Sequence, residues 1–147
     1  MKTCRLHVSA ILLLLVLTAS ASAMAQGTII VRVTAFRSAA GNIHLSLYNK
    51  EERFPDEDMR IRLLKVPVTN SSVVEMKFEN VPYGTYAIAG LHDENRSGSM
   101  DYTWMGMPKE GYCFSNDAKP FLSAPSFSEA KFKLDKPQKV VQIAMQY

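Results

Sequence analysis

Short segments with an apolar residue at every second position recur along the chain and constrain its fold more than any other feature. Successive side chains of a β-strand point to opposite faces of a sheet, so each such segment is expected to be a strand with one buried face. The expected strands are residues 27–36, 43–48, 71–80, 86–92, 126–134 and 138–147. Strands of this length and spacing, without a convincing long helix, predict an all-β fold, and specifically an antiparallel β-sandwich with one long ordered loop.

Three local features refine this expectation. The first two strands are separated only by a short turn around Gly41, so a β-hairpin is the expected local unit. Tyr86 follows a Pro-x-Gly turn and is expected to hydrogen-bond back to the backbone of that turn, as tyrosines do in other sandwiches. Residues 49–68 carry mixed charges that nearly cancel, so we expect a solvated connection between sheets, with Phe54 or Leu63 reaching the core.

The N-terminal residues have the pattern of an export signal. Lys2 and Arg5 precede an almost wholly apolar run at residues 8–17, and small residues follow it. This run is shorter than the ~20 residues of a membrane-spanning helix. We therefore expect a signal peptide at residues 1–25, a single exported domain at residues 26–147, and no integral membrane segment after cleavage. The domain would be periplasmic or secreted.

Charge and cysteine content exclude other classes of protein. The chain has 17 Lys and Arg against 14 Asp and Glu, and removing Lys2 and Arg5 leaves 15 against 14, a net charge of +1. No basic stripe with interleaved aromatic residues is present, so nucleic acid is not an expected partner. Cys4 would leave with the signal, and Cys113 alone makes no internal disulfide.

The stretch from residue 93 to residue 101 has most of the spacing of a calcium-binding loop. Side chains with oxygen stand at its first, third, fifth and ninth positions, and a glycine stands at the sixth. The candidate metal ligands are Asp93, Asn95, Ser97, Ser99 through its carbonyl, and Asp101. Trp104 stands where an EF-hand has its closing glutamate, so Glu110, Asp117 or water would have to complete the shell. Any calcium affinity is expected to be weak, about 10⁻⁴–10⁻³ M. The alternative is a turn in which the Asp93 and Asn95 side chains bond the local backbone.

Residues 93–125 have no sustained period but are rich in aromatic side chains. Such a segment is too apolar to remain solvated, so it is expected to fold over one end of the sandwich, ordered by its own aromatic cluster. Tyr102, Trp104 and Tyr112 are the candidate ligand-binding residues, since they are suited to stack on a sugar or anchor a partner protein. The alternative is that they form a small core of the loop itself, as we expect for Phe114 and Phe121.

Two motifs in this region resemble a known family. Leu91-His92-Asp93-Glu94-Asn95-x-Ser97-Gly98-x-Met100-Asp101 is followed by Met107-Pro108-Lys109-Glu110-Gly111-Tyr112-x-Phe114-Ser115-Asn116. Together they are similar to the signature of the exported bacterial family called domain of unknown function 2141. The resemblance covers essentially the whole expected mature chain. It implies a prealbumin-like or immunoglobulin-like sandwich and carries no activity with it.

No catalytic constellation is evident. His44, His92 and Cys113 lack the paired spacing of zinc ligands, and no Gly-x-Ser-x-Gly motif occurs. A hydrolase built on Cys113 would need an acid and a base converging on one pocket. We therefore expect a non-enzymatic module whose calcium-stabilised aromatic loop binds an envelope protein or a glycan. The alternative is a purely structural envelope protein whose loop is a stabilising lid without bound metal.

Overall fold

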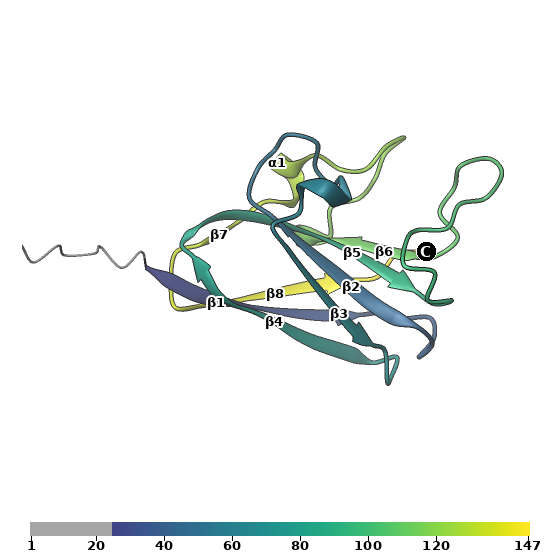
Figure 1. Cartoon of the computed structure of the whole chain (residues 1–147), viewed down its shortest axis with the longest axis horizontal. Coiled ribbons are helices and arrows are strands. Elements are labelled where there is room, and N and C mark those ends of the chain that lie inside the picture. Colours follow the sequence, from purple (N-terminus) through teal and green to yellow (C-terminus); the bar gives the residue numbers. More distant parts are fainter. Residues whose placement is uncertain (1–24) are drawn as a thin grey trace, which may run out of the picture.

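The computed structural model describes residues 25–147, so the expected signal peptide lies outside the described residues except for Ala25. Two sheets pack face to face (Figure 1). The smaller sheet has the strand order β4 (Val73–Pro82), β1 (Gln26–Thr34), β8 (Gln138–Ala144). The larger has the order β3 (Arg62–Pro67), β2 (Asn42–Tyr48), β5 (Gly84–Asp93), β6 (Gly111–Phe114), and β7 (Phe132–Leu134) pairs with the start of β5.

These sheets confirm the expected all-β sandwich. The pair β1–β8 is parallel, and the other named strand pairs are antiparallel. The helical elements are short: η1 (Glu57–Met59), η2 (Ser115–Asp117) and α1 (Phe127–Ala130). None of the helices in this part of the chain has the length and apolarity needed to span a membrane.

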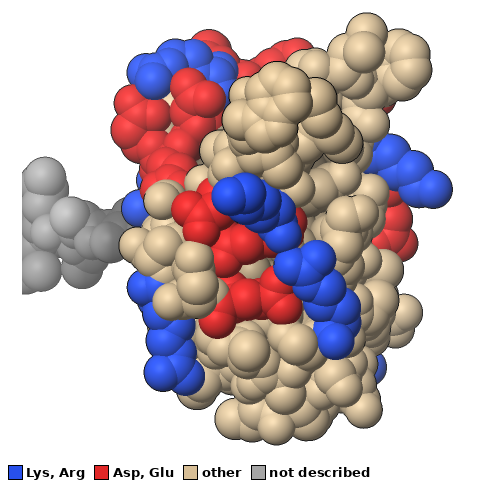
Figure 2. All heavy atoms as spheres, turned by 90° about the vertical axis from the view of Figure 1, so that its right-hand side faces the viewer, with Lys and Arg blue, Asp and Glu red and all other residues tan. Residues whose placement is uncertain are grey.

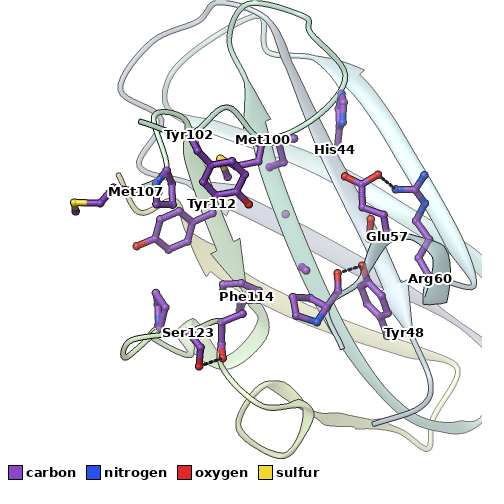
Figure 3. A pocket seen from close by; sticks show the side chains of 18 of the residues that line it. His44, Tyr48, Glu57, Arg60, Met100, Tyr102, Met107, Tyr112, Phe114 and Ser123 are labelled. Carbon is purple, nitrogen blue, oxygen red and sulfur yellow. Dashed lines mark hydrogen bonds and ion pairs between the residues drawn. The ribbon is translucent and has the colours of Figure 1, made fainter. Parts of the chain in front are cut away.

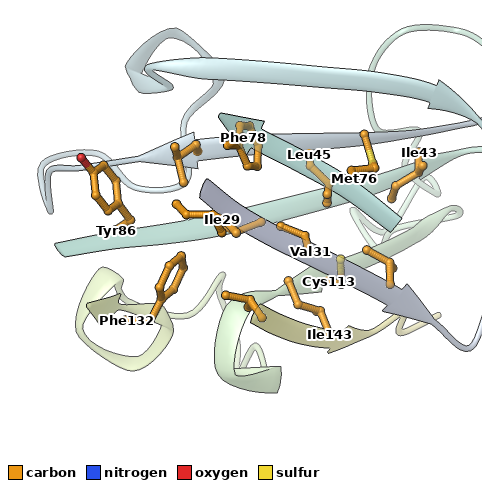
Figure 4. Packing of buried hydrophobic residues seen from close by; sticks show 14 of the residues in the cluster. Ile29, Val31, Ile43, Leu45, Met76, Phe78, Tyr86, Cys113, Phe132 and Ile143 are labelled. Carbon is orange, nitrogen blue, oxygen red and sulfur yellow. The ribbon is translucent and has the colours of Figure 1, made fainter. Parts of the chain in front are cut away.

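The core lies between the sheets, where the alternating strands place their apolar side chains (Figure 4). The expected inner faces of the first two strands are fully buried: Ile29, Val31, Val33, Ile43, Leu45 and Leu47. Met76 and Phe78 of β4 and Ile143 of β8 join them with 4 % exposure or less. Burying this much branched and aromatic surface supplies the main driving force of the fold, since each such side chain contributes about 1.5–3 kcal/mol.

The expected hairpin of the first two strands is wrong, because β1 and β2 lie in different sheets. Ala35 adopts a left-handed backbone conformation with φ 61°, which breaks the alternation, so Phe36 rather than Ala35 is buried. Gly41 has φ 72°, and a Cβ there would lie 2.0 Å from the Asp93 carbonyl oxygen. The connection therefore crosses from one layer to the other and starts β2 alongside the end of β5.

The charged segment after β2 is only partly the expected solvated connection. Residues 62–67 form the edge strand β3, with Leu64 and Val66 packed against the core and Leu63 exposed. Phe54 does reach the interior, where it packs against Tyr48 with the ring planes 88° apart. Edge strands often carry charged residues, which makes the alternation of apolar and polar residues less regular. For this reason the sequence pattern did not predict β3.

Residues 126–134 are not one strand. Ser126 caps the short helix α1 in a capping box: its hydroxyl accepts from Glu129 N at 3.3 Å, while its own N–H donates to Glu129 Oε2 at 2.8 Å. The strand β7 follows only at Phe132. The expected Tyr86 contact is confirmed, since the phenol donates to the Pro82 carbonyl at 2.7 Å.

The outer face of the larger sheet is also largely buried, contrary to expectation. With Ile43, Leu45 and Leu47 facing the core, the alternation of residues 43–48 predicts that His44, Ser46 and Tyr48 face solvent, but they are 8 %, 9 % and 2 % exposed. Part of this face is covered by a second apolar cluster, formed by Tyr48, Ala87, Phe114, Phe127 and Ala130 with Phe54 packed against it. The remaining part, toward the β5–β6 loop, is the floor of the groove described below.

Candidate functional site

The loop between β5 and β6, residues 94–110, projects beyond the ends of the strands (Figure 1). Asp93 ends β5, pairs with Asn42 in the register, and is completely buried. Its carboxylate accepts hydrogen bonds from Ser97 N at 2.9 Å and from Gly98 N at 3.0 Å. Gly98 has φ 95°, a backbone conformation that favours glycine and makes this bend.

All the candidate metal ligands belong to one hydrogen-bonded network. Asn95 Oδ1 also accepts from Ser97 N at 2.9 Å, and the Ser97 hydroxyl donates to the Ser99 carbonyl at 2.9 Å. The Asn95 amide nitrogen donates to Asp101 Oδ2 at 2.6 Å. The structure thus brings the five candidate residues together. It does so with the side-chain-to-backbone bonds of the turn that the sequence offered as the alternative to calcium.

A second buried carboxylate, Glu110, closes the loop from its other end. Its Oε1 accepts from Glu94 N at 3.0 Å and its Oε2 from Asp101 N at 3.2 Å, and the residue is 5 % exposed. Asp117 lies elsewhere and accepts from Ala144 N at 2.8 Å. Of the two carboxylates considered for completing a calcium shell, only Glu110 therefore belongs to the loop.

Positive charge reaches the loop at Glu94. The Arg37 guanidinium pairs with the Glu94 carboxylate and also donates to the Lys109 carbonyl at 2.9 Å. The Arg37 hydrogen bond is the main cause that lowers the pKa of Glu94 below its ordinary value. In the middle of this end of the molecule acidic side chains gather with basic side chains beside them, and uncharged side chains lie above and below (Figure 2).

His44 lies beside the buried end of the loop. Its Nε2 is 3.3 Å from Asp93 Oδ2, but the geometry is not that of a hydrogen bond, and this nitrogen has no hydrogen-bond partner among residues 25–147. Burial is the largest cause that lowers the pKa of His44 below its ordinary value, which favours the neutral ring. Among the described residues, no three His, Cys, Asp or Glu side chains are arranged to hold a metal ion. The loop also offers oxygen atoms of other kinds that can coordinate a metal ion, from its Asn and Ser side chains and its backbone carbonyls.

The other two residues weighed as zinc ligands have structural surroundings. His92 bonds the Tyr147 hydroxyl at 2.7 Å through Nδ1 and the Ala40 carbonyl at 2.8 Å through Nε2. Cys113 is completely buried in the core, and this burial raises the pKa of its thiol to about 12. A thiol of that pKa is not a nucleophile at neutral pH, since the thiolate is the reactive form.

The tip of the loop carries the aromatic candidates into solvent. Tyr102 bridges Pro108, and Thr103 N donates to the Met107 carbonyl at 2.8 Å, so the tip is a short hairpin-like turn. Trp104 is 93 % exposed and Tyr102 57 %. We expected the loop's own aromatic cluster to order it, and this expectation is wrong, because these side chains are exposed. The loop is ordered by the polar bonds of Asp93 and Glu110.

The remaining aromatic residues divide between interior and surface. Tyr112 lies on β6, is half-buried, and packs against the second cluster. Phe114 is buried, but in this cluster on the sheet rather than in the small core of the loop itself that the sequence had suggested. Phe121 is 84 % exposed and its neighbour Leu122 98 %, so the expectation that Phe121 is a core residue is wrong.

A groove of about 620 Å³ runs between this loop, the residues after η2 and the residues around η1 (Figure 3). Its floor is the uncovered part of the outer sheet face, with His44 and Ser46 from β2, Ala89 from β5 and Tyr112 from β6. Tyr102 and Tyr112 line the groove, whereas Trp104 stands outside it at the loop tip. This groove could not be predicted from the sequence, because it depends on which half of the outer face the distant segments cover.

The fold and the site define a β-sandwich domain that presents a hydrogen-bonded polar loop next to an open groove. By sequence, the chain belongs to a bacterial family, described as "Uncharacterized protein conserved in bacteria (DUF2141)", whose model matches residues 31–142. The resemblance seen in the sequence motifs is thereby confirmed. No curated protein and no solved structure matches the chain.

Proposed function

We propose that this protein is an exported, non-enzymatic binding module that uses the β5–β6 loop to hold an envelope protein or a glycan. The observation that carries the proposal is the exposure of large apolar side chains on a loop that is otherwise fixed. Trp104, Met105, Met107 and Tyr102 are 93 %, 63 %, 60 % and 57 % exposed. Several large apolar side chains exposed on one loop are typical of an interaction site, and Trp and Tyr are common binding anchors.

The loop is held in one conformation by buried carboxylates, and this supports a role in binding. The Asp93 and Glu110 carboxylates each accept two backbone N–H groups of the loop. Such charge-assisted bonds are roughly twice as strong as neutral ones. A loop that is ordered before it meets its ligand loses less conformational entropy on binding. The same aromatic contacts therefore give a higher affinity than they would on a flexible loop.

A direct test uses Trp104, the only tryptophan of the chain. The chain from Gln26 onward would be titrated separately with purified bacterial peptidoglycan and with solubilised envelope proteins while tryptophan emission and acrylamide quenching are measured. We expect one fraction to shift the emission to shorter wavelength and to protect Trp104 from quenching. Trp104→Ala should lose retention on that fraction, whereas Val140→Ala, an exposed apolar residue of β8, should not. Unchanged emission with both fractions would refute the proposal.

Calcium is part of the proposal as a weak stabiliser of the loop. The support is the convergence of Asp93, Asn95, Ser97, Ser99 and Asp101 in one network with Glu110 beside it. Bound cation would relieve the repulsion of these carboxylates and stabilise the folded state in proportion to its occupancy. The unfolding midpoint should fall in EDTA and rise in millimolar calcium, and Asp101→Asn should remove that rise. A midpoint that does not move ends the calcium part alone.

The second candidate is a structural envelope protein whose loop is a lid without metal. The observation in its favour is that the loop closes on its own backbone through Asp93 and Asn95. It predicts that Asp93→Ala lowers the melting temperature while retention on envelope fractions is unchanged. The exposure of Trp104 favours the binding module, because a lid would turn this side chain inward.

A further inference from the structure

The groove beside the loop has a floor shaped by residue size. On the outer face of the larger sheet, Ala89 of β5 pairs with Ser46 of β2 and Phe114 of β6, and Leu91 of β5 pairs with His44 and Tyr112. The neighbouring small side chains of Ala89 and Ser46 leave room above the sheet at that point. The groove's volume of about 620 Å³ lies within the roughly 300–1,000 Å³ of small-ligand sites.

The two walls of this groove differ in chemistry. Tyr102 and Met107 stand on one side, next to Tyr112 of the floor, while Glu57 and Arg60 stand on the other (Figure 3). One wall therefore offers aromatic and apolar faces, and the opposite wall offers charged hydrogen-bonding groups. A ligand that fills the groove has to match both.

The polar wall has hydrogen-bonding capacity to spare. Arg60 Nη1 donates to Glu57 Oε2 at 3.1 Å, and the two side chains are 31 % and 61 % exposed. A guanidinium has five N–H groups and a carboxylate has about four acceptor sites, so this single bond leaves most of both unused. An acyl chain or a purely apolar peptide anchor laid across the groove would desolvate these charges without replacing their bonds to water, which is unfavourable.

A sugar ring meets both requirements, because one face of a pyranose carries C–H groups while its edge carries hydroxyls. We propose that the groove binds a short oligosaccharide, with a ring stacked on Tyr102 and its hydroxyls bonded to Glu57 and Arg60. This inference rests on the proposed function and narrows its ligand from an envelope protein or glycan to a glycan.

The test is a glycan array followed by calorimetry with the best-retained oligosaccharide, using the chain from Gln26 onward. We expect retention of at least one array sugar. Glu57→Gln, Arg60→Gln and Tyr102→Ala should each weaken the affinity for it by about tenfold or more. All three side chains are at least partly exposed, and a melting curve for each variant checks that the fold is kept.

Matched controls come from elsewhere on the surface. Arg32 and Glu75 form an exposed pair at 2.9 Å on the other sheet, and Phe121 is an exposed aromatic residue outside the groove. Arg32→Gln, Glu75→Gln and Phe121→Ala should leave the affinity unchanged.

Three results would overturn the inference. These are an array without a retained sugar, sugar binding that the groove variants leave intact, and binding of the apolar dye 1-anilinonaphthalene-8-sulfonate in the groove that no retained sugar displaces. Failure of the proposed function is distinguishable, because its readout is the emission of Trp104, which lies outside the groove. A Trp104 shift with envelope proteins but no retained sugar refutes only the glycan inference.

Discussion

Replacing Glu110 by Gln tests whether buried carboxylates, rather than aromatic packing, hold the β5–β6 loop. Both carboxylate oxygens accept backbone N–H groups, from Glu94 at 3.0 Å and Asp101 at 3.2 Å. Glutamine keeps one acceptor oxygen and turns an NH₂ group toward the other N–H. One charge-assisted bond is lost and one buried donor is left unpaired, which costs about 1.5–3 kcal/mol.

The expected loss is large enough to measure by thermal unfolding. A domain of this size loses about 3–5 °C per kcal/mol, so Glu110→Gln should lower the midpoint by about 5–15 °C. Circular dichroism would follow the transition, and hydrogen exchange would follow the two amides. We expect the amides of Glu94 and Asp101 to exchange faster in the variant.

The control is Glu79→Gln, the same chemical change at an exposed position of β4, which should leave both measurements unchanged within error. If Glu110→Gln shifts the midpoint by no more than this control and leaves the two amides equally protected, the loop is held by something other than Glu110.

Other measurements probe the core and the floor of the groove. Cys113, whose pKa is raised to about 12 by burial, should resist a thiol reagent at pH 8 in the folded chain and react at once in denaturant; reaction at equal rates would contradict its place in the core. His44 has a lowered pKa in the folded state, so stability should be fully present above its ordinary value of 6.5 and fall as the pH drops below it. His44→Gln should remove that part of the pH dependence, and an unchanged profile would contradict it. Tyr86→Phe loses the bond to the Pro82 carbonyl and should cost about 1 kcal/mol in urea unfolding, whereas a neutral change would mean that water replaces the bond.

The sequence was most informative where a strand has one face in the core. In β1 and β8 the alternation identified the buried side chains, because burial on a single face forces a period of two. In β2 it identified the residues that face the core, but not the buried residues of the outer face. It was least informative at β3, an edge strand whose charged residues hide the alternation. The helix α1 had a readable signal, since Ser126 and Glu129 have the spacing of a capping box.

The site could be predicted only in part, for a physical reason. The residues from Asp93 to Asp101 are close in sequence, so their convergence followed from local turn chemistry. Glu110 lies at the far end of the loop and His44 on β2, so their proximity to Asp93 depends on how β2, β5 and β6 pair. The two-faced groove likewise requires knowing that the segments around η1 and η2 cover only part of the outer sheet face.

The exposed aromatic residues make sense once the source of the loop's order is known. A loop held by packing would have to bury Trp104 and Tyr102 against itself, and those side chains would then be unable to contact anything else. Here Asp93 and Glu110, one at each end of the loop, satisfy backbone N–H groups of Glu94, Ser97, Gly98 and Asp101, at distances between 2.9 and 3.2 Å. Order supplied by buried carboxylates leaves the apolar side chains free to be the contact surface.

The same Asp93 lies 3.3 Å from His44 on the groove floor, so the loop and the groove share one buried anchor. A change at Asp93 should therefore disturb ligand contacts on the loop tip and in the groove together, whereas a change at Trp104 should affect the tip alone.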